Sequence, residues 1–244
     1  MTQTQLSVNL NKIALIRNSR GHGFPDVREF AALALDQGAV GVTIHPRPDQ
    51  RHARYEDIAD LRVLVNSYTD KELNVEGYPT DILVDHVITQ RPHQFTLVPD
   101  EPDQITSDHG WDLKRHGDWV RPVIERCQQS GIRTSLFVDP DPEQVRRAAD
   151  TGTDRIELYT EDYAEAWKHG DHKAVLAKYM ECADLARELG LTVNAGHDLD
   201  LQNLADFAAA GNVAEVSIGH ALTVEALRYG FAETVRRYVT ILAR

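Results

Sequence analysis

Side chains able to do chemistry stand where short apolar segments of this sequence end. The segment 40–45 alternates apolar with polar residues and finishes in the imidazole of His45. A strand buried in a parallel sheet is normally apolar on both faces. The alternation therefore predicts a strand with one polar buried face, directed at a reaction chamber.

Five further apolar segments end in the same way. Their polar residues belong to four classes, imidazole, carboxylate, amide and guanidinium, which serve proton transfer and anion binding. We expect these groups to converge if the segments are parallel strands. In chain order they are Asn9, Asn11, Lys12, His45, Arg47, Glu76, Glu157, Asn194, His197, Asp198, Gly219 and His220.

His45, Glu76 and His197 are the candidates for acid–base catalysis. Burial and neighbouring charges can bring the pKa of such groups toward neutrality, where they exchange protons efficiently. Each also has a structural alternative. A histidine can serve only as a hydrogen-bonded core residue, and Glu76 and Glu157 can form buried ion pairs, since a buried carboxylate must be paired, hydrogen-bonded or protonated.

Gly196 and Gly219 indicate a phosphate site. In a (β/α)₈ barrel, phosphate commonly binds to the loops after strands seven and eight, where backbone N–H groups and a helix dipole stabilise the dianion. Gly219 could instead only permit a tight turn. Arg20, Arg47 and His52 could bind a second phosphate through charge-assisted hydrogen bonds.

Metal catalysis has weak support. His169 and His172 are spaced like a ligand pair, but no other feature accompanies them, and we interpret their segment as a solvated loop. The chain has Asn9-Leu10-Asn11 where a metallohydrolase barrel would be expected to present His-x-His. The sequence therefore predicts no metal site.

Eight apolar segments alternate with helical patterns, which implies parallel strands joined by helical crossovers. Eight units in 244 residues fit a closed (β/α)₈ TIM barrel of about 250 residues. No GxGxxG or P-loop pattern follows a strand, which weighs against a doubly wound dinucleotide fold. We expect one domain spanning 1–244. The expected strands are 6–11, 40–45, 73–76, 94–98, 132–139, 155–159, 191–195 and 214–218.

Two long connections carry no predicted strand or helix, 99–117 and 160–170. Loops of this length in a compact domain commonly have a function. We interpret 99–117, which contains Thr106, as a lid over the active site. The last helix is expected at 224–242.

The composition of the sequence limits the classes of molecule that the protein can bind and the compartment in which it acts. A formal net charge of −12 makes nucleic acid or an anionic membrane a poor partner. No apolar run approaches the roughly 18 residues of a membrane span, and residues 1–5 lack the features of a signal peptide. Cys127 and Cys182 lie outside any CxxC and are expected to be buried thiols of a cytoplasmic protein.

The sequence resembles the pyridoxine 5′-phosphate synthase family from Leu6 to the C-terminal helix. The two most specific segments are 45–52 (His-Pro-Arg-Pro-Asp-Gln-Arg-His) and 194–197 (Asn-Ala-Gly-His). Further similar segments are 7–9, 17–21, 74–76, 97–99, 135–139 and 218–221.

The resemblance implies a (β/α)₈ barrel that assembles into a homo-octamer and uses no metal or organic cofactor. The implied reaction condenses 3-amino-2-oxopropyl phosphate with 1-deoxy-D-xylulose 5-phosphate. Its products are pyridoxine 5′-phosphate, inorganic phosphate and water. No partner other than these small phosphorylated molecules and further copies of the chain is implied.

The resemblance also assigns roles to residues. It makes His45 the general base, His197 the general acid, Glu76 a third proton-transfer group and Glu157 a carboxylate that stabilises a charged intermediate. The substrate-binding residues that it implies are Asn9 and Arg20 for the aminoketone, Arg47, His52 and Thr106 for the phosphate that is expelled, and Gly219 and His220 for the phosphate that is retained.

Four positions depart from the family pattern. Asn11–Lys12 replaces Asp-His, Asp198 replaces Gly, and Tyr159 replaces His. Lys12 could contact sugar or phosphate in place of the imidazole. An inward Asp198 carboxylate would repel phosphate, although its backbone N–H could still donate. Two other functions stay open: a different cofactor-free aldolase or isomerase of phosphosugars, and a non-catalytic barrel that binds a vitamin B6 phosphate.

Overall fold

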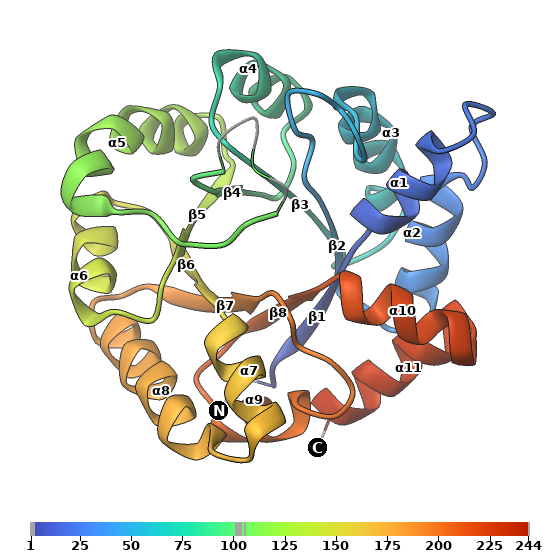
Figure 1. The fold of residues 1–244 in the computed structure, drawn as a ribbon. Coiled ribbons are helices and arrows are strands. Elements are labelled where there is room, and N and C mark those ends of the chain that lie inside the picture. Colours follow the sequence, from blue (N-terminus) through green and yellow to red (C-terminus); the bar gives the residue numbers. More distant parts are fainter. Residues whose placement is uncertain (1–2, 101–103, 105, 244) are drawn as a thin grey trace.

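Eight parallel strands close into a barrel in the computed structural model, which describes residues 3–100, 104 and 106–243. Each strand pairs with the next, and β8 pairs with β1 (Figure 1). The predicted (β/α)₈ fold is confirmed. The strands are β1 (Gln5–Asn9), β2 (Gly41–Ile44), β3 (Glu72–Gly77), β4 (Gln94–Leu97), β5 (Arg133–Val138), β6 (Arg155–Tyr159), β7 (Thr192–Gly196) and β8 (Glu215–Ile218).

The alternation along the strands divides a polar lumen from an apolar shell. Inside the barrel the hydroxyls of Ser7 and Thr43 lie 2.8 Å apart. Asn74 donates to Thr43 over 3.4 Å and accepts from Thr96 over 3.0 Å. These side chains satisfy one another, as buried polar groups must. The intervening residues, such as Val42, pack in the hydrophobic core.

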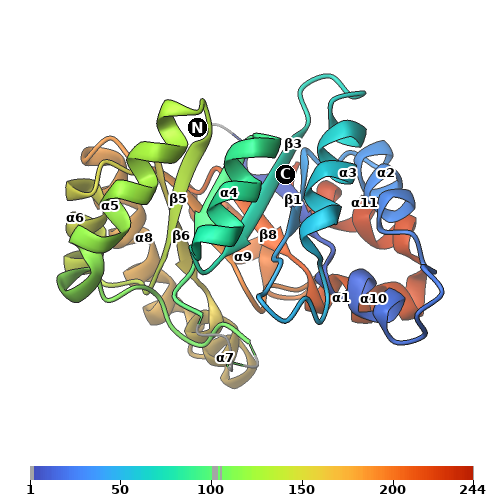
Figure 2. The same cartoon turned by 90° about the horizontal axis from the view of Figure 1, so that it is seen from above.

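Helices surround the barrel (Figures 1 and 2). The start of α6 follows the local signals of its sequence, since Asp141 caps the helix by accepting from the Glu143 N–H and Pro142 stands in the first turn. The helices are α1 (Asn11–Asn18), α2 (Val27–Asp36), α3 (Tyr55–Val65), α4 (Asp81–Gln90), α5 (Leu113–Gln129), α6 (Pro142–Asp150), α7 (Glu161–His169), α8 (His172–Glu188), α9 (Leu204–Ala210), α10 (His220–Tyr229) and α11 (Phe231–Leu242).

Three predicted boundaries were wrong. Strand β1 ends at Asn9, and the residues from Asn11 form helix α1. Its N-cap is Leu10, whose side chain cannot cap, so the usual start signal is missing. The segment 160–170, expected to be a loop, contains α7, whose acidic first turn and basic last turn suit the helix dipole. The C-terminal helix is two helices, separated at Gly230.

The predicted lid is shorter than expected, because α5 begins at Leu113 with Asp112 as its cap. Of its residues, 101–103 and 105 lie outside the described residues. The end of the loop is fixed to the barrel: the Trp111 indole donates to the Leu97 carbonyl over 2.9 Å, and the Gly110 N–H donates to Asp139 over 2.9 Å. Its action as a lid stays a prediction.

Helices α1, α7 and α10 follow β1, β6 and β8 within two residues and lie at the C-terminal ends of the strands (Figure 2). They surround the mouth where the candidate site was expected. In the described part of the chain, no helix combines the length and apolarity needed to span a bilayer.

Candidate active site at the barrel mouth

Glu76 occupies the centre of the mouth. It lies on β3, and its carboxyl is reached by the Asn9 amide from β1 over 3.4 Å and by the Ser217 hydroxyl from β8 over 3.5 Å. Burial raises its pKa well above the ordinary value, and the charge of Glu157 raises it further. The environment of Glu76 therefore favours its protonated form, which can donate a proton.

Glu157 lies beside it on β6, buried against β7. A Cβ atom at Gly196 would stand 2.2 Å from Glu157 Oε1, so any side chain at residue 196 would displace this carboxyl from its observed position. Its other oxygen has no hydrogen-bond partner among the described residues. Burial, with a smaller contribution from the charge of Glu215, raises the pKa of Glu157 to about 8.

The environment of His45 lowers its pKa, whereas that of Glu76 and Glu157 raises theirs, and the imidazole is therefore kept neutral. Burial lowers its pKa well below the ordinary value, and the neighbouring Arg47 charge lowers it further. Its backbone N–H donates to Asn11 Oδ1 over 2.8 Å, and the Asn11 N–H donates to Asn9 Oδ1 over 3.0 Å. Asn11, one of the residues expected at the site, thus links the end of β1 to His45, the residue that follows β2. A neutral His45 can accept a proton.

His197 follows β7 at the same mouth. Its Nε2 lies 3.3 Å from the Thr106 hydroxyl, and its Nδ1 lies 2.8 Å from a carboxylate oxygen of Asp198. The Tyr159 ring stands edge-on to the imidazole, with 5.1 Å between centroids. Thr106, His197 and Asp198 are thereby brought together from two segments that are far apart in sequence.

The residues after β2 form a cationic group. Arg47 pairs with the buried Asp100 and donates to the Gln104 carbonyl over 2.7 Å, and Arg51 donates to the same carbonyl. The His52 ring lies 6.1 Å from that of His45. Burial lowers the pKa of His52 to about 4, and the charges of Arg47, Arg51 and Lys12 contribute, which places Lys12 near this group.

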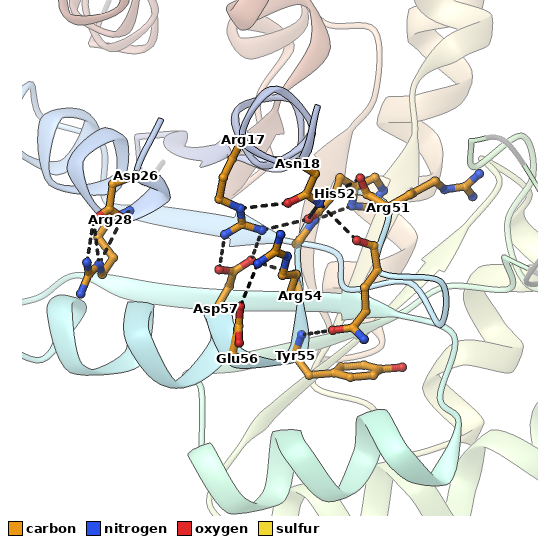
Figure 3. Close-up of polar contacts among 12 residues, drawn as sticks. Arg17, Asn18, Asp26, Arg28, Arg51, His52, Arg54, Tyr55, Glu56 and Asp57 are labelled. Atoms are coloured by element: carbon orange, nitrogen blue, oxygen red, sulfur yellow. Dashed lines mark hydrogen bonds and ion pairs between the residues drawn. The ribbon is translucent and has the colours of Figure 1, made fainter. Parts of the chain in front are cut away.

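Helix α1 anchors this cationic loop, a role that sequence analysis missed (Figure 3). The Asn18 amide donates to the carbonyls of Gln50, Arg51 and His52 over 3.2, 3.0 and 2.7 Å. Arg17 donates to the His52 carbonyl over 3.1 Å and forms a buried ion pair with Asp57. The only signal in the sequence was the family-like segment 17–21.

Gly219 and His220 begin α10 at the mouth. A Cβ atom at Gly219 would stand 2.9 Å from Asn9 Cβ, so its glycine permits close approach of β8 to β1. His220 lies near enough to Asp198 to help lower the pKa of that carboxyl. The N-terminus of α10 thus lies at the mouth and has no side-chain cap; phosphate binding there stays a prediction.

Arg20 is the predicted site residue that this single chain does not place at the mouth. It is exposed in the turn after α1, and the loop that continues from it projects away from the barrel axis (Figure 1). Within the described residues its guanidinium has no hydrogen bond or ion pair.

The histidine pair set aside above is also separated. His169 contacts Glu165 at the end of α7, and His172 contacts Asp206 of α9. His169 ends α7 and His172 begins α8, so the loop expected here is reduced to Gly170 and Asp171. Across the described residues, no group of three or more histidine, cysteine, aspartate or glutamate side chains is arranged to hold a metal ion.

Residues 6–244 match the family described as pyridoxal phosphate biosynthesis protein PdxJ. The chain belongs to the PdxJ family. Proteins named pyridoxine 5′-phosphate synthase are similar to it over nearly their full length. That of Albidiferax ferrireducens is 47% identical, covering 99% of this chain and 98% of the relative. That of Xylella fastidiosa is 50% identical, covering 98% and 95%. The family expected from the sequence motifs, and with it an enzyme of vitamin B6 biosynthesis, is confirmed.

Solved structures outside the PdxJ family share the fold. The 3-keto-L-gulonate-6-phosphate decarboxylase of Vibrio cholerae superposes with a TM-score of 0.68 at 11% identity, covering 100% of this chain and 99% of the other. The tryptophan synthase α-subunit of Pyrococcus furiosus gives 0.64 at 14% identity, covering 100% and 99%. At such low identity these similarities concern the barrel alone.

Proposed function

We propose that the barrel mouth condenses 3-amino-2-oxopropyl phosphate with 1-deoxy-D-xylulose 5-phosphate to form pyridoxine 5′-phosphate, inorganic phosphate and water. One observation carries the assignment of the site. A neutral imidazole, His45, and two carboxyls with raised pKa, Glu76 and Glu157, share the mouth. Groups whose environments drive their pKa values in opposite directions form an acid–base set.

The chemistry needs such a set at every stage. The aminoketone nitrogen adds to the sugar ketone and water leaves, giving an imine. Removal of a proton from carbon yields an enamine, which expels phosphate. Addition of water, closure onto the second carbonyl and loss of water complete the aromatic ring. Each transfer by a positioned side chain contributes about 10²–10⁴-fold in rate.

Individual roles follow from the protonation states. Neutral His45 accepts protons from the reacting carbon, and protonated Glu76 donates to the leaving hydroxyl. His197 acts as a second acid at the opposite side of the mouth. Glu157, expected by resemblance to stabilise a charged intermediate as a carboxylate, is assigned here the further capacity to donate a proton, because its pKa lies above neutral.

Two anion sites suit two phosphorylated substrates. The N-terminus of α10, with Gly219 and His220, would hold the phosphate that the product keeps. The cationic group of Arg47, His52 and Lys12, with Thr106, would hold the phosphate that is expelled. Asn9 would orient the aminoketone while donating to Glu76.

Assembly into a homo-octamer in the cytoplasm is part of the same proposal. Apolar side chains are exposed on α1 and its following loop, where Ile16 is 46% and Phe24 75% exposed, and on α10, where Leu227 is 82% exposed. Helices α1 and α10 contact each other and lie on the same side of the molecule (Figure 2). Such a surface suits burial against another copy. Two buried unpaired thiols, Cys127 and Cys182, support a reducing compartment.

Leu227→Glu should shift the protein to smaller assemblies, because a charge replaces an apolar contact. Native mass spectrometry would measure the distribution. Val63→Glu is the matched control, since Val63 is 74% exposed on α3, on another side of the barrel. An assembly disrupted only by Val63→Glu would move the proposed interface away from α10.

The function is tested by mixing purified protein with both substrates and following phosphate release together with pyridoxine phosphate fluorescence. Equal formation of both products is expected. Consumption of the sugar phosphate with neither product formed would instead support a phosphosugar aldolase or isomerase. Tight binding of pyridoxine phosphate without turnover would support a carrier.

Asn18→Ala should raise KM for the sugar phosphate by about 10-fold with little change in kcat. The loop that bears Arg51 and His52 loses the donor that binds three of its carbonyls. A net hydrogen-bond loss of about 1.4 kcal/mol corresponds to a tenfold change in affinity. Arg28→Ala is the control, because its exposed pair with Asp26 lies away from the loop (Figure 3). An unchanged KM in Asn18→Ala would contradict the anchoring role.

A further inference from the structure

The turn that carries His197 has an unusual backbone. His197 and the next residue, Asp198, have φ of 85° and 56°. Two successive non-glycine residues in this region are uncommon, because their side chains crowd the backbone carbonyls. The turn is held from both sides. The Thr160 hydroxyl lies 2.7 Å from the Gly196 carbonyl and also contacts that of His197. The Asn203 amide donates to the Asp198 carbonyl over 3.1 Å.

This conformation turns the Asp198 carboxylate onto the imidazole of its neighbour. Asp198 Oδ2 lies 2.8 Å from His197 Nδ1. That hydrogen bond lowers the pKa of Asp198, with smaller contributions from the charges of His197, Lys168 and His220. An ionised carboxylate only accepts hydrogen bonds. The proton of the pair therefore resides on Nδ1.

The other nitrogen faces the mouth. His197 Nε2 lies 3.3 Å from the Thr106 hydroxyl, and the edge-on ring of Tyr159 limits rotation of the imidazole. A carboxylate at Nδ1 fixes both the ring orientation and the tautomer, leaving Nε2 as the atom that exchanges a proton. If the Asp198 carboxylate were directed at the phosphate site instead, it would fix neither the orientation of the His197 ring nor its tautomer.

We propose that Asp198 is a positioning residue for His197: its carboxylate holds the Nδ1–H tautomer, so that Nε2 exchanges protons with the substrate. This proposal rests on the function proposed above, in which His197 transfers protons. In this proposal the aspartate that replaces glycine at position 198 assists proton transfer by His197, and its carboxylate does not repel the substrate phosphate.

Asp198→Gly is the first test, because glycine suits the positive φ and removes only the carboxylate. Its unfolding temperature should equal or exceed that of the parent. Its kcat should fall roughly 10–10²-fold, as for a misoriented catalytic group, with KM for both substrates within about 3-fold of the parent. Asp198→Asn should behave similarly, because an amide can donate to Nδ1 as well as accept from it.

The imidazole itself supplies the second measurement. In protein labelled with ¹⁵N-histidine, two-bond ¹H–¹⁵N spectra should place the His197 proton on Nδ1 in the parent. Asp198→Gly should give a mixture of tautomers or the Nε2–H form. The His197→Gln spectrum assigns the resonance. Asp206→Asn, which removes the carboxylate charge next to His172 of α8, is the matched control and should leave both kcat and the His197 signals unchanged.

Two results would overturn the proposal: a parent in which Nε2 carries the proton of neutral His197, or an Asp198→Gly variant that keeps the parental tautomer and kcat. A parent that forms no pyridoxine phosphate would count against the proposed function. In that case the tautomer spectra would still decide whether Asp198 positions His197.

Discussion

Replacing Glu76 by glutamine is expected to lower kcat by about 10²–10⁴-fold, the usual contribution of one proton-transfer group. The amide keeps the size of the side chain. Its oxygen can accept from Asn9 and its NH2 group can donate to the Ser217 hydroxyl, the two groups that contact the carboxyl in the structure. The barrel should therefore stay folded while the transferable proton is lost. Steady-state formation of pyridoxine phosphate and a thermal unfolding curve measure the two effects.

Glu72→Gln is the control for this variant. Glu72 lies four residues earlier on β3, on the same face of the strand, and its carboxylate pairs with Arg133 in the barrel lumen. The control should lower the unfolding temperature and leave kcat near the parental value. A Glu76→Gln protein that turns over within about 3-fold of the parent would show that Glu76 is a core residue and transfers no proton.

The second large effect concerns stability. Burial raises the pKa of Glu157 from its ordinary 4.5 to about 8. Between those two values the unfolded chain releases the proton of this group while the folded chain retains it. The folded state therefore loses stability as pH rises through this window, and the loss is complete above about pH 8.

Glu157→Gln removes this dependence. Its free energy of unfolding relative to the parent should rise between pH 5 and pH 9 by on the order of 3 kcal/mol. Any cost of the unsatisfied amide does not depend on pH, so it cancels from the difference. Turnover should fall at every pH, because the variant has no carboxyl beside Glu76. Urea unfolding at the two pH values measures the change.

Glu143→Gln controls for general effects of pH. Glu143 is exposed on α6, where its hydrogen bond to Arg147 lowers its pKa. The control should show no gain in stability toward high pH. A Glu157→Gln protein whose relative stability declines from pH 5 to pH 9 would mean that Glu157 is ionised in the fold, and its assignment as a proton donor would be wrong.

Much of this site could be predicted because its signals are local. The alternation in 40–45 predicted a polar face that ends in His45, and the barrel topology then placed Glu76, Glu157 and His197 at one mouth. Strand periodicity encodes which face a residue occupies. It needs no knowledge of contacts between distant segments.

What was missed depends on contacts between distant segments or on weak start signals. Helix α1 has no capping side chain, so nothing local marked its beginning. The bonds from Asn18 to the loop at 50–52 join segments more than thirty residues apart. Asp198 was considered for its charge toward phosphate, whereas the backbone torsion that turns it onto His197 is fixed by Thr160 and Asn203.

The close contact between Gly196 and Glu157 has an evolutionary consequence. With only 2.2 Å between Glu157 Oε1 and the place of a Cβ atom at residue 196, the two positions cannot vary independently. Alanine at 196 would force the Glu157 carboxyl to move, which would withdraw it from its place in the mouth. Among active descendants, this glycine and this glutamate should be inherited as a pair.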